Sequence, residues 1–298
     1  MCSLMCTDTL YVILPYFNYC GFKKRKSLFV DFVKRIQKLQ GIKIIIAENG
    51  KSLPKLNVHK HFKFKVEHKI WIKENLINMA TNLLPKNWKY MAWIDADITF
   101  LNTNWVNDTI KSLRTYDVVQ LFQTAVNLGP NGESFKIDKS FGYMHDKSGT
   151  PYVKSDKYGF WHPGYAWAIR REAWDKMGGL IDWAILGSAD RHMALAWIGR
   201  VMTSCPGNIH ENYKALLQEY EIMCRGFKLS CIDGTILHHW HGSLENRKYR
   251  ERWDILTKNK FDPLIDLVTS KSCVSLSESG LRLEKDIMDY FSERKEDD

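Results

Sequence analysis

Two short apolar runs separated by an amphipathic segment constrain the fold of this chain more than any other feature. The runs lie within residues 9–19 and 43–49, and both are continuous rather than alternating. Continuous apolar runs of this length are typical of parallel strands that are buried on both faces. Between them, after a basic loop at residues 23–26, we predict a helix that begins at Ser27. Its apolar side carries Leu28, Val33, Ile36 and Leu39. A right-handed parallel β-α-β unit is the expected result.

The alternation of strands and helices continues through the first half of the chain. Predicted elements are a short strand within residues 58–66, a helix at 70–84, a strand at 89–98, a helix at 104–114 and a strand at 117–122. Such alternation indicates an α/β fold, with a mixed, mostly parallel sheet flanked by helices. Ligands of such sheets bind beyond the carboxyl ends of the strands, where Asn18, Glu48 and Asp97 fall.

The second half of the chain is less regular. Residues 127–158 are rich in glycine and lysine, and we predict a mobile flap over the site there. Later predicted elements are a strand at 165–169, a helix closed by Gly178, a helix capped by Ser188, a helix at 208–224, strand material at 227–236, a basic helix at 245–258 and an amphipathic tail from residue 277 whose charged end frays.

Composition indicates an ordinary globular protein with an anionic partner. The chain has 298 residues, of which 45% are hydrophobic and 26% charged, and its net charge is +9. This excess of Lys and Arg favours nucleotide phosphates, nucleic acid or an acidic membrane as the partner. Because the basic residues are dispersed between core elements, no nucleic-acid partner is expected.

The chain lacks the sequence signals of membrane insertion and secretion. No apolar segment approaches the roughly 18 residues of a membrane span, and Asp8 interrupts the region where a signal peptide would be apolar. We therefore expect a soluble, cytoplasmic protein without a transmembrane segment. The seven cysteines lack metal-type spacing and favour reduced thiols, although Cys2 and Cys6 also admit metal or lipid binding.

The predicted strand at residues 89–98 ends on two acids, Asp95 and Asp97. Side chains two apart on a strand share a face, so both carboxylates are expected to point the same way. Two like charges side by side repel each other unless a cation lies between them. Paired oxygen ligands suit Mg²⁺ or Mn²⁺, often shared with substrate phosphates. A polar turn after a strand is the plain alternative.

A histidine-rich stretch near residue 240 is the second strong signal. His239 and His241 are two apart, so on extended backbone both can reach one metal, and Gly242 lets backbone approach a ligand. With an acidic pair elsewhere in the sheet, a mixed Asp and His site for Mn²⁺ is favoured over a core histidine pair.

Three basic residues, Arg247, Lys248 and Arg250, follow this stretch. Their charges would be useful for holding a diphosphate. For any one of them, a solvated basic face is the alternative.

Asp190 is expected in the first turn of the helix that Ser188 caps. A helix N-terminus stabilises a carboxylate, which could then take a proton from a hydroxyl group. Upstream, Trp161 and Tyr165 flank Gly164, and their rings could stack on a carbohydrate or belong to the core. Of the aromatic residues here, Trp161 is expected to be the most exposed.

The order of these features resembles the nucleotide-sugar glycosyltransferases of the GT-A fold, especially the family 2 and galactosyltransferase-like groups. The matching stretches are residues 12–18, 48–49, 75 with 78, 95–97, 164–171 with 178–179, 239–242 and 247–250. The resemblance implies a GT-A domain over residues 1–258, with a nucleotide-binding half at 1–125 and a flap and acceptor-binding half at 126–258. Residues 259–298 would then form a C-terminal helical extension.

The resemblance also implies roles for individual residues. Asp97 would bind the metal, Asp95 would contact the ribose or the metal, and His241 with His239 would complete the metal site. The donor would be held by Tyr16, Asn18, Glu48, Asn75, Arg247, Lys248 and Arg250, and the acceptor by Trp161, Gly164 and Tyr165. The family's catalytic base usually follows an acidic pair, and this slot reads Ala189-Asp190, so the first acid is missing. Asp190 is the expected base if the enzyme inverts.

The function implied is a metal-dependent transfer of a sugar from a nucleotide-diphosphate donor to a hydroxyl group. The cofactor would be Mn²⁺ or Mg²⁺, the donor a UDP-sugar by family precedent, and the acceptor a glycan, glycoprotein or glycolipid. Paired acids, histidines and a basic rim would also serve a metal-dependent nucleotidyltransferase or phosphohydrolase acting on nucleotides. An inactive sugar-binding homologue is a third interpretation.

Overall fold

The strand β1 (Leu10–Tyr16) is an inner strand of a seven-stranded sheet in the computed structural model, which describes residues 8–153, 161–270 and 273–298. The strand order is β10-β6-β9-β4-β1-β2-β3. The other strands are β2 (Ile42–Asn49), β3 (Lys60–Phe64), β4 (Tyr90–Ile94), β6 (Val118–Gln120), β9 (Ala166–Arg170) and β10 (Leu229–Cys231). Only β9 runs against its neighbours β4 and β6, and the remaining pairs are parallel. The mixed, mostly parallel sheet is therefore confirmed.

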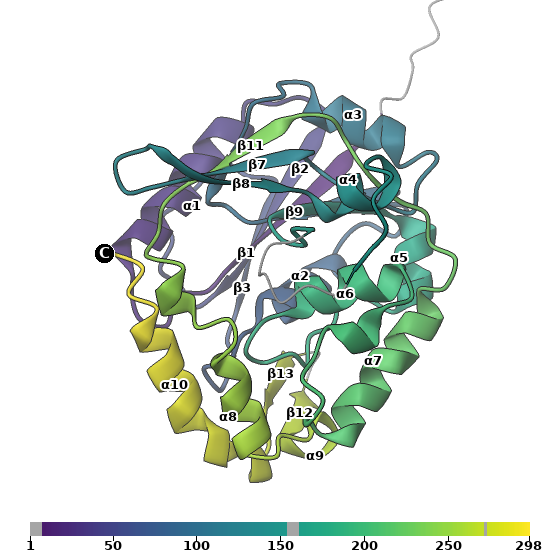
Figure 1. Cartoon of the computed structure of the whole chain (residues 1–298). Helices are drawn as coiled ribbons and strands as arrows, with labels where there is room; N and C mark the ends of the chain where they lie inside the picture. The colour runs from purple at the N-terminus through teal and green to yellow at the C-terminus, as the bar shows by residue number, and fades with distance from the viewer. Residues whose placement is uncertain (1–7, 154–160, 271–272) are drawn as a thin grey trace, which may run out of the picture.

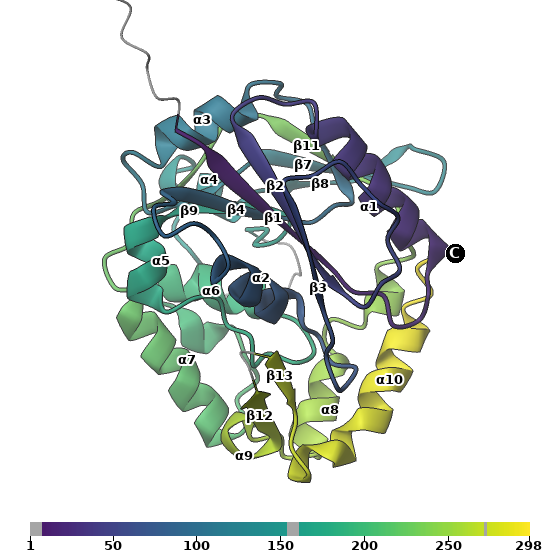
Figure 2. The same ribbon diagram turned by 180° about the vertical axis from the view of Figure 1, so that it is seen from behind.

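Helices cover both faces of this sheet (Figures 1 and 2). Along β1, Leu10, Val12 and Leu14 belong to one apolar core, whereas Tyr11 and Ile13 belong to another. The first core is completed by α1 (Lys23–Ile36) and α3 (Trp105–Ser112). The second is completed by α2 (Lys73–Thr81), α5 (Arg171–Met177), α6 (Ala189–Trp197) and α7 (Glu211–Met223). A strand buried on both faces explains why its apolar run is continuous.

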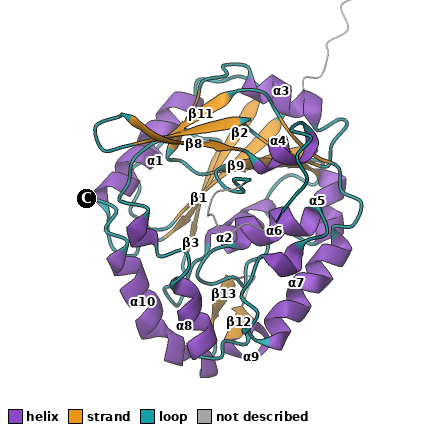
Figure 3. Cartoon of the chain, in the orientation of Figure 1, coloured by secondary structure: helices purple, strands orange, loops and turns teal. Residues whose placement is uncertain are grey.

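A second sheet, of order β5-β11-β7-β8, lies beside the first, and its strands are orange in Figure 3. They are β5 (Ile98–Phe100), β7 (Thr124–Leu128), β8 (Ser134–Lys139) and β11 (Thr235–His238), and α4 (Phe141–Asp146) follows β8. Residues 127–153 thus contain β8 and α4 in place of the irregular loop that was expected. That the segment moves as a flap stays a prediction, and residues 154–158 lie outside the described ranges. The strand β7 pairs in parallel with β11, a partner so distant in sequence that no local pattern reports it.

Several predicted helix bounds are also corrected. The helix α1 begins at Lys23 rather than Ser27, so the basic residues 23–26 form its first turn instead of a loop. The helix α2 is shorter than predicted. The predicted basic helix at 245–258 is a 3₁₀ turn, η2 (Glu245–Arg247), and a separate helix α8 (Arg252–Lys258). Between them Lys248 has φ of 45°, and this left-handed backbone ends the turn.

Residues 259–298 pack on the body of the protein. They form α9 (Pro263–Asp266), the antiparallel pair β12 (Leu267–Ser270) and β13 (Cys273–Leu276), η3 (Ser279–Leu283) and α10 (Glu284–Glu293), so the segment is not purely helical. Phe261, Ile287 and Phe291 share the core of α2 and α6. The charged end does not fray, because Arg294 and Glu296 are buried.

The described cysteines are free thiols, whereas Cys2 and Cys6 lie outside the described residues. Among the helices that the structure describes, none combines the length and apolar character needed to cross a bilayer.

Candidate active site

Two adjoining cavities open at the carboxyl ends of β1 and β4. One, here called the Asp97 cavity, is lined by residues that include Tyr16, Arg25, Asp97 and His241. The other, here called the Asp190 cavity, is lined by residues that include Glu74, His162, Gly164, Tyr165 and Asp190. Five residues line both cavities: Trp71, Lys73, Asp95, Arg247 and Arg294. The location agrees with the rule that ligands of such sheets bind beyond the carboxyl ends of the strands.

Asp97, His238 and His241 form a cluster that could hold a metal ion, here called the Asp–His cluster. Oδ2 of Asp97 lies 2.9 Å from Nε2 of His241 and 3.8 Å from Nε2 of His238. Oδ1 of Asp97 is buried and has no hydrogen-bond partner among the described residues. An unpartnered buried carboxylate oxygen beside two imidazoles fits a divalent cation such as Mn²⁺.

The tautomer of His238 follows from its second neighbour, Asn127. The amide nitrogen of Asn127 donates to Oδ2 of Asp138 at 2.9 Å, so its Oδ1 faces His238 as an acceptor. Nδ1 of His238 donates to this Oδ1 at 2.9 Å, which leaves the lone pair of Nε2 facing Asp97. Burial also holds the pKa of His238 well below its usual range, so the ring is neutral. A neutral imidazole oriented in this way can bind a metal ion through Nε2.

His239 does not join this cluster, and the prediction for it is wrong. Its Nε2 lies 2.7 Å from the hydroxyl oxygen of Thr99 on β5. The prediction assumed extended backbone from His239 to His241, but β11 ends at His238. Because the chain leaves the strand there, the two-residue alternation of side chains no longer applies and His238 and His241 converge instead.

Asp95 faces the cavities but is engaged by a lysine that sequence reasoning missed. Lys73, at the start of α2, forms an ion pair with Asp95. Burial raises the pKa of Asp95 above its usual value, although Lys73 opposes this effect. The two acids are thus unequal, since for Asp97 the effect of burial is outweighed by His241 and Arg247, and the pKa of Asp97 is lowered. Lys73, rather than a shared cation, is the positive partner of Asp95.

Arg247 places positive charge between the two cavities. Its NH2 lies 2.8 Å from Nε2 of His241. Its Nε is buried without a hydrogen-bond partner among the described residues, which suits a donor that meets an anionic ligand. Arg25 and Arg294, neither of which sequence reasoning singled out, line the same Asp97 cavity.

Asp190 lies in the first turn of α6, as predicted. Its Oδ1 accepts from the backbone N–H of Arg191 at 2.8 Å. A Cβ added to Gly164 would lie 3.2 Å from its Oδ2, so glycine at position 164 lets the backbone pass close to this carboxylate. Ser188 does not cap the helix with its side chain, because its hydroxyl oxygen accepts from Arg252 instead.

A second carboxylate, Glu74, shares the Asp190 cavity. It accepts a hydrogen bond from Nε1 of Trp71 at 3.1 Å. Burial raises its pKa to about 7. Sequence reasoning missed this residue, since a glutamate in the first turn of a helix carries no signal of its burial.

Two of the three predicted acceptor residues line one of the cavities, and their role toward an acceptor stays a prediction. Tyr165 and Gly164 line the Asp190 cavity, and the Tyr165 ring stacks on His162 with a centroid distance of 4.2 Å. Trp161 was expected to be exposed, and this is wrong because only 4% of its surface is accessible. It packs edge-on against Phe141 and Tyr152.

Of the predicted nucleoside residues, only Tyr16 lines the Asp97 cavity. Asn18 bridges the turn before α1, where it accepts from the backbone N–H of Phe22 and donates to the carbonyl of Phe22. Glu48 is fully buried and accepts from the backbone N–H groups of Ser52 and Leu53.

Three further predicted donor residues also lie outside the Asp97 cavity. Asn75 donates to Asp182 and accepts from the backbone of Val274. Lys248 forms an ion pair with Glu293 at the surface. Arg250 lines a separate cavity with Arg191, Cys205 and Trp253. These placements give Asn75 and Lys248 structural contacts in place of ligand contacts.

The residues that sequence reasoning missed share one property. Lys73, Asn127, His238, Arg294 and Glu296 reach the site through tertiary packing. His238 is one of three histidines within residues 238–241, and Arg25 is one of four consecutive basic residues at 23–26. Either run could have added its residue to the candidate set. Arg294 and Glu296 belong to the charged end of the chain, whereas Lys73 and Asn127 stand in no motif.

Comparison with known proteins gives a likeness to solved structures. No protein-family model matches the chain, and no curated protein matches it. The catalytic domain of Drosophila β1,4-galactosyltransferase 7 in complex with xylobiose is similar at 16% identity, with a TM-score of 0.36 over 66% of this chain and 62% of that one. A mutant of that enzyme in complex with manganese, UDP-Gal and xylobiose gives the same values.

A third similar structure is 4-diphosphocytidyl-2C-methyl-D-erythritol synthase from Anaerococcus prevotii, at 12% identity, with a TM-score of 0.34 over 76% of this chain and 88% of that one. The chain thus matches less than two thirds of the galactosyltransferase chain. At such identities and scores the likeness concerns the course of the backbone, and the functional argument rests on the residues of this protein.

Proposed function

We propose that this protein is a divalent-metal-dependent glycosyltransferase that moves a sugar from a nucleotide-diphosphate donor to a hydroxyl acceptor. The observation that carries the proposal is the juxtaposition of the Asp–His cluster and the Asp190 carboxylate on two cavities that share Lys73, Asp95 and Arg247. Candidate metal ligands on one cavity and a carboxylate on the adjoining one suit a transfer between two bound substrates.

Asp97, His238 and His241 would hold Mn²⁺ or Mg²⁺ in the Asp97 cavity. When bound, the ion would neutralise the negative charge that develops on the leaving diphosphate. The mixed nitrogen and oxygen donor set favours Mn²⁺ over Mg²⁺, which prefers oxygen ligands. The buried, unpartnered Oδ1 of Asp97 is the atom that most needs such a partner.

Arginines of the Asp97 cavity would bind the diphosphate of the donor. Arg247 and Arg25 both line it, and the buried Nε of Arg247 is without a partner among the described residues. Guanidinium groups bind phosphate oxygens through paired N–H donors and stabilise the charge of the leaving group. Tyr16 lines the same cavity and would contact the nucleoside. A UDP-sugar is the donor we propose, on the strength of the sequence resemblance.

Asp190 would act as the base toward the acceptor. A hydroxyl group is a weak nucleophile unless a carboxylate removes its proton as the new bond forms. The cavity that Gly164 and Asp190 both line would admit the acceptor hydroxyl next to Oδ2 of Asp190. Attack from the Asp190 side on a sugar whose diphosphate lies in the Asp97 cavity would invert the anomeric carbon. The acceptor would be a glycan, glycoprotein or glycolipid, held in the cavity that Gly164 and Tyr165 line.

The proposal is tested by binding and turnover together. Thermal shift with UDP-, GDP- and dTDP-sugars, with and without Mn²⁺, would be compared between the wild type and Asp97→Ala, since a ligand that binds the folded state raises its stability. We expect a Mn²⁺-dependent shift with one sugar nucleotide that the variant loses. Product analysis would then follow release of the nucleotide and transfer of the sugar to a panel of acceptors. A nucleotide product formed without any sugar transfer would instead identify a phosphohydrolase.

A further inference from the structure

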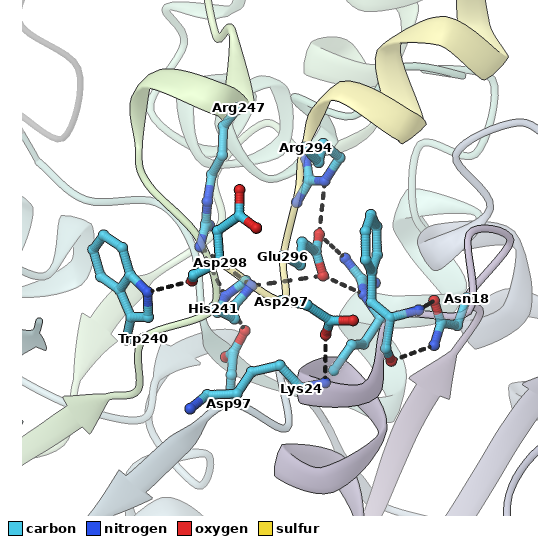
Figure 4. A network of polar contacts seen from close by, with 12 residues as sticks. Asn18, Lys24, Asp97, Trp240, His241, Arg247, Arg294, Glu296, Asp297 and Asp298 are labelled. Atoms are coloured by element: carbon cyan, nitrogen blue, oxygen red, sulfur yellow. Dashed lines mark hydrogen bonds and ion pairs between the residues drawn. The ribbon is translucent and has the colours of Figure 1, made fainter. Parts of the chain in front are cut away.

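The last residues of the chain, 294–298, return to the Asp97 cavity and are here called the C-terminal segment (Figure 4). Within it, Glu296 is 1% exposed. Its carboxylate is hydrogen-bonded by two arginines. Nε of Arg25 lies 2.6 Å from Oε2, and Nε of Arg294 lies 2.8 Å from Oε1. A buried carboxylate costs free energy unless it is paired in this way, so the pairing defines where the segment lies.

Three further contacts fix the path of this segment. The side chain of Asp297 accepts from the backbone N–H groups of Lys23 and Lys24 at 3.0 and 2.7 Å, in the first turn of α1. Nε1 of Trp240 donates to the carbonyl oxygen of Asp298 at 2.8 Å. A Cβ at Gly242 would lie 2.9 Å from the carbonyl oxygen of Lys295. The glycine after the histidine stretch therefore admits the passing backbone of the C-terminal segment.

Glu296 also lies behind a residue of the Asp–His cluster. Its Oε2 is 3.7 Å from Nδ1 of His241, while Nε2 of the same ring faces Oδ2 of Asp97 at 2.9 Å. His241 is thus flanked by carboxylates on both ring nitrogens. Where a histidine binds metal through one nitrogen, a carboxylate at the other orients the ring and raises its basicity.

Arg25 and Arg294, the two partners of Glu296, line the Asp97 cavity. Arg294 is further held by the Tyr290 hydroxyl oxygen, which accepts from its NH1 at 3.1 Å, and by the Trp71 ring below its guanidinium. The carboxylate of Glu296 therefore connects one cluster histidine with two cations of the cavity wall. A segment that only covered an apolar surface would not need this charge.

We propose that Glu296 is a positioning residue of the metal and donor site, and that the C-terminal segment forms one wall of that site. This inference rests on the proposed function, because it assigns Glu296 a role toward the metal and the donor diphosphate. Glu296 orients His241 toward the metal and holds Arg25 and Arg294 toward the diphosphate. The acidic tail is thus part of the active site and not a solvated extension.

The test compares Glu296→Gln with Glu293→Gln, a matched control. Glu293 lies at the end of α10, is half-exposed and pairs with Lys248 away from both cavities. Isothermal titration would measure Mn²⁺ affinity without nucleotide, and then UDP affinity in saturating Mn²⁺. We expect Glu296→Gln to weaken Mn²⁺ binding by about 10- to 100-fold, the usual effect of losing a partner behind a ligand, and Glu293→Gln to leave it unchanged. Glu296→Asp, which keeps the charge, should recover part of the affinity.

A second variant, Asp297→Asn, guards against loss of folding in Glu296→Gln. Asp297 is exposed, and its substitution weakens the hydrogen bonds to the backbone of Lys23 and Lys24 without touching the cluster. We expect it to weaken Mn²⁺ binding in the same direction by a smaller factor. If Glu296→Gln binds Mn²⁺ and UDP as tightly as the wild type does, the inference about Glu296 is wrong and the proposed function is unaffected. Absence of any Mn²⁺ binding in the wild type would instead overturn the proposed function.

Discussion

Nδ1 of His238 donates a hydrogen bond to Oδ1 of Asn127 at 2.9 Å, across 111 positions of sequence. This bond selects the tautomer in which Nε2 of His238 faces Asp97. The same oxygen accepts from the hydroxyl of Tyr165 at 2.8 Å, so Asn127 joins the Asp–His cluster to the Asp190 cavity.

Substitution of Asn127 is expected to weaken metal binding although Asn127 is not a ligand. In Asn127→Ala the His238 ring loses the acceptor that fixes its tautomer, and Mn²⁺ affinity should fall by roughly 10- to 100-fold. Isothermal titration with Mn²⁺ measures this. Asn131→Ala, in the exposed turn between β7 and β8, is the control and should bind like the wild type. Equal affinities of both variants would mean that the tautomer of His238 has no bearing on the site.

The two neighbouring histidines give a direct test of the cluster. His238→Ala should lower Mn²⁺ affinity by at least about 10-fold, whereas His239→Ala should change it little, because His239 contacts Thr99. Both variants are titrated under the same conditions. A larger loss of Mn²⁺ affinity in His239→Ala than in His238→Ala would identify His239 as the ligand, as its spacing from His241 in the sequence predicted. It would contradict the cluster of Asp97, His238 and His241.

Asp190→Asn should reduce turnover without reducing donor binding. Loss of a base that acts in the transition state typically costs about 10²- to 10⁴-fold in rate. We expect kcat to fall by this factor while Mn²⁺ and UDP affinities are retained. Glu74→Gln, in the same cavity, is the matched control and should lower kcat much less. If Glu74→Gln proves the more damaging substitution, Glu74 is the base.

Lys73→Met should destabilise the fold because it leaves the Asp95 carboxylate without its partner. Removing one member of a buried pair costs about 3–5 kcal/mol, and here about 2 kcal/mol is expected because 27% of the Asp95 side chain is accessible. Urea denaturation measures the free energy of unfolding. The double variant Lys73→Met, Asp95→Asn should recover most of the loss, and a purely additive result would show that the two side chains do not interact.

The pH dependence of stability is expected to carry a signature of His192. Burial lowers its pKa to about 3, and its ring nitrogens contact Ser204 and Tyr213. Below the ordinary pKa of 6.5 the unfolded chain binds a proton that the folded protein does not, so stability falls with decreasing pH down to about 3. One proton corresponds to about 1.4 kcal/mol per pH unit.

The variant His192→Gln isolates this contribution, because other buried histidines, such as His162 with its pKa of about 4, titrate in both proteins. The free energy of unfolding between pH 6 and 4 should fall less steeply in the variant than in the wild type. Parallel slopes would show that His192 takes up its proton without unfolding.

The sequence by itself determined the main sheet and the position of its acids. Continuous apolar runs at β1 and β2 reported burial on both faces, and the run that became β4 placed Asp95 and Asp97 at its carboxyl end. The helix start at Ser188 likewise placed Asp190 in a first turn. These features depend on local hydrophobic periodicity and on helix-start residues, which are encoded within a few positions of the sequence.

Only the tertiary structure decided which side chains meet. His238 replaced His239 because β11 ends between them, and Lys73 reached Asp95 because α2 packs on β1. The charged end of the chain, which was expected to fray, is held at the Asp97 cavity by Arg25 of α1. Ion pairs and strand pairings between distant segments depend on how the elements pack, and no local pattern in the sequence encodes that packing.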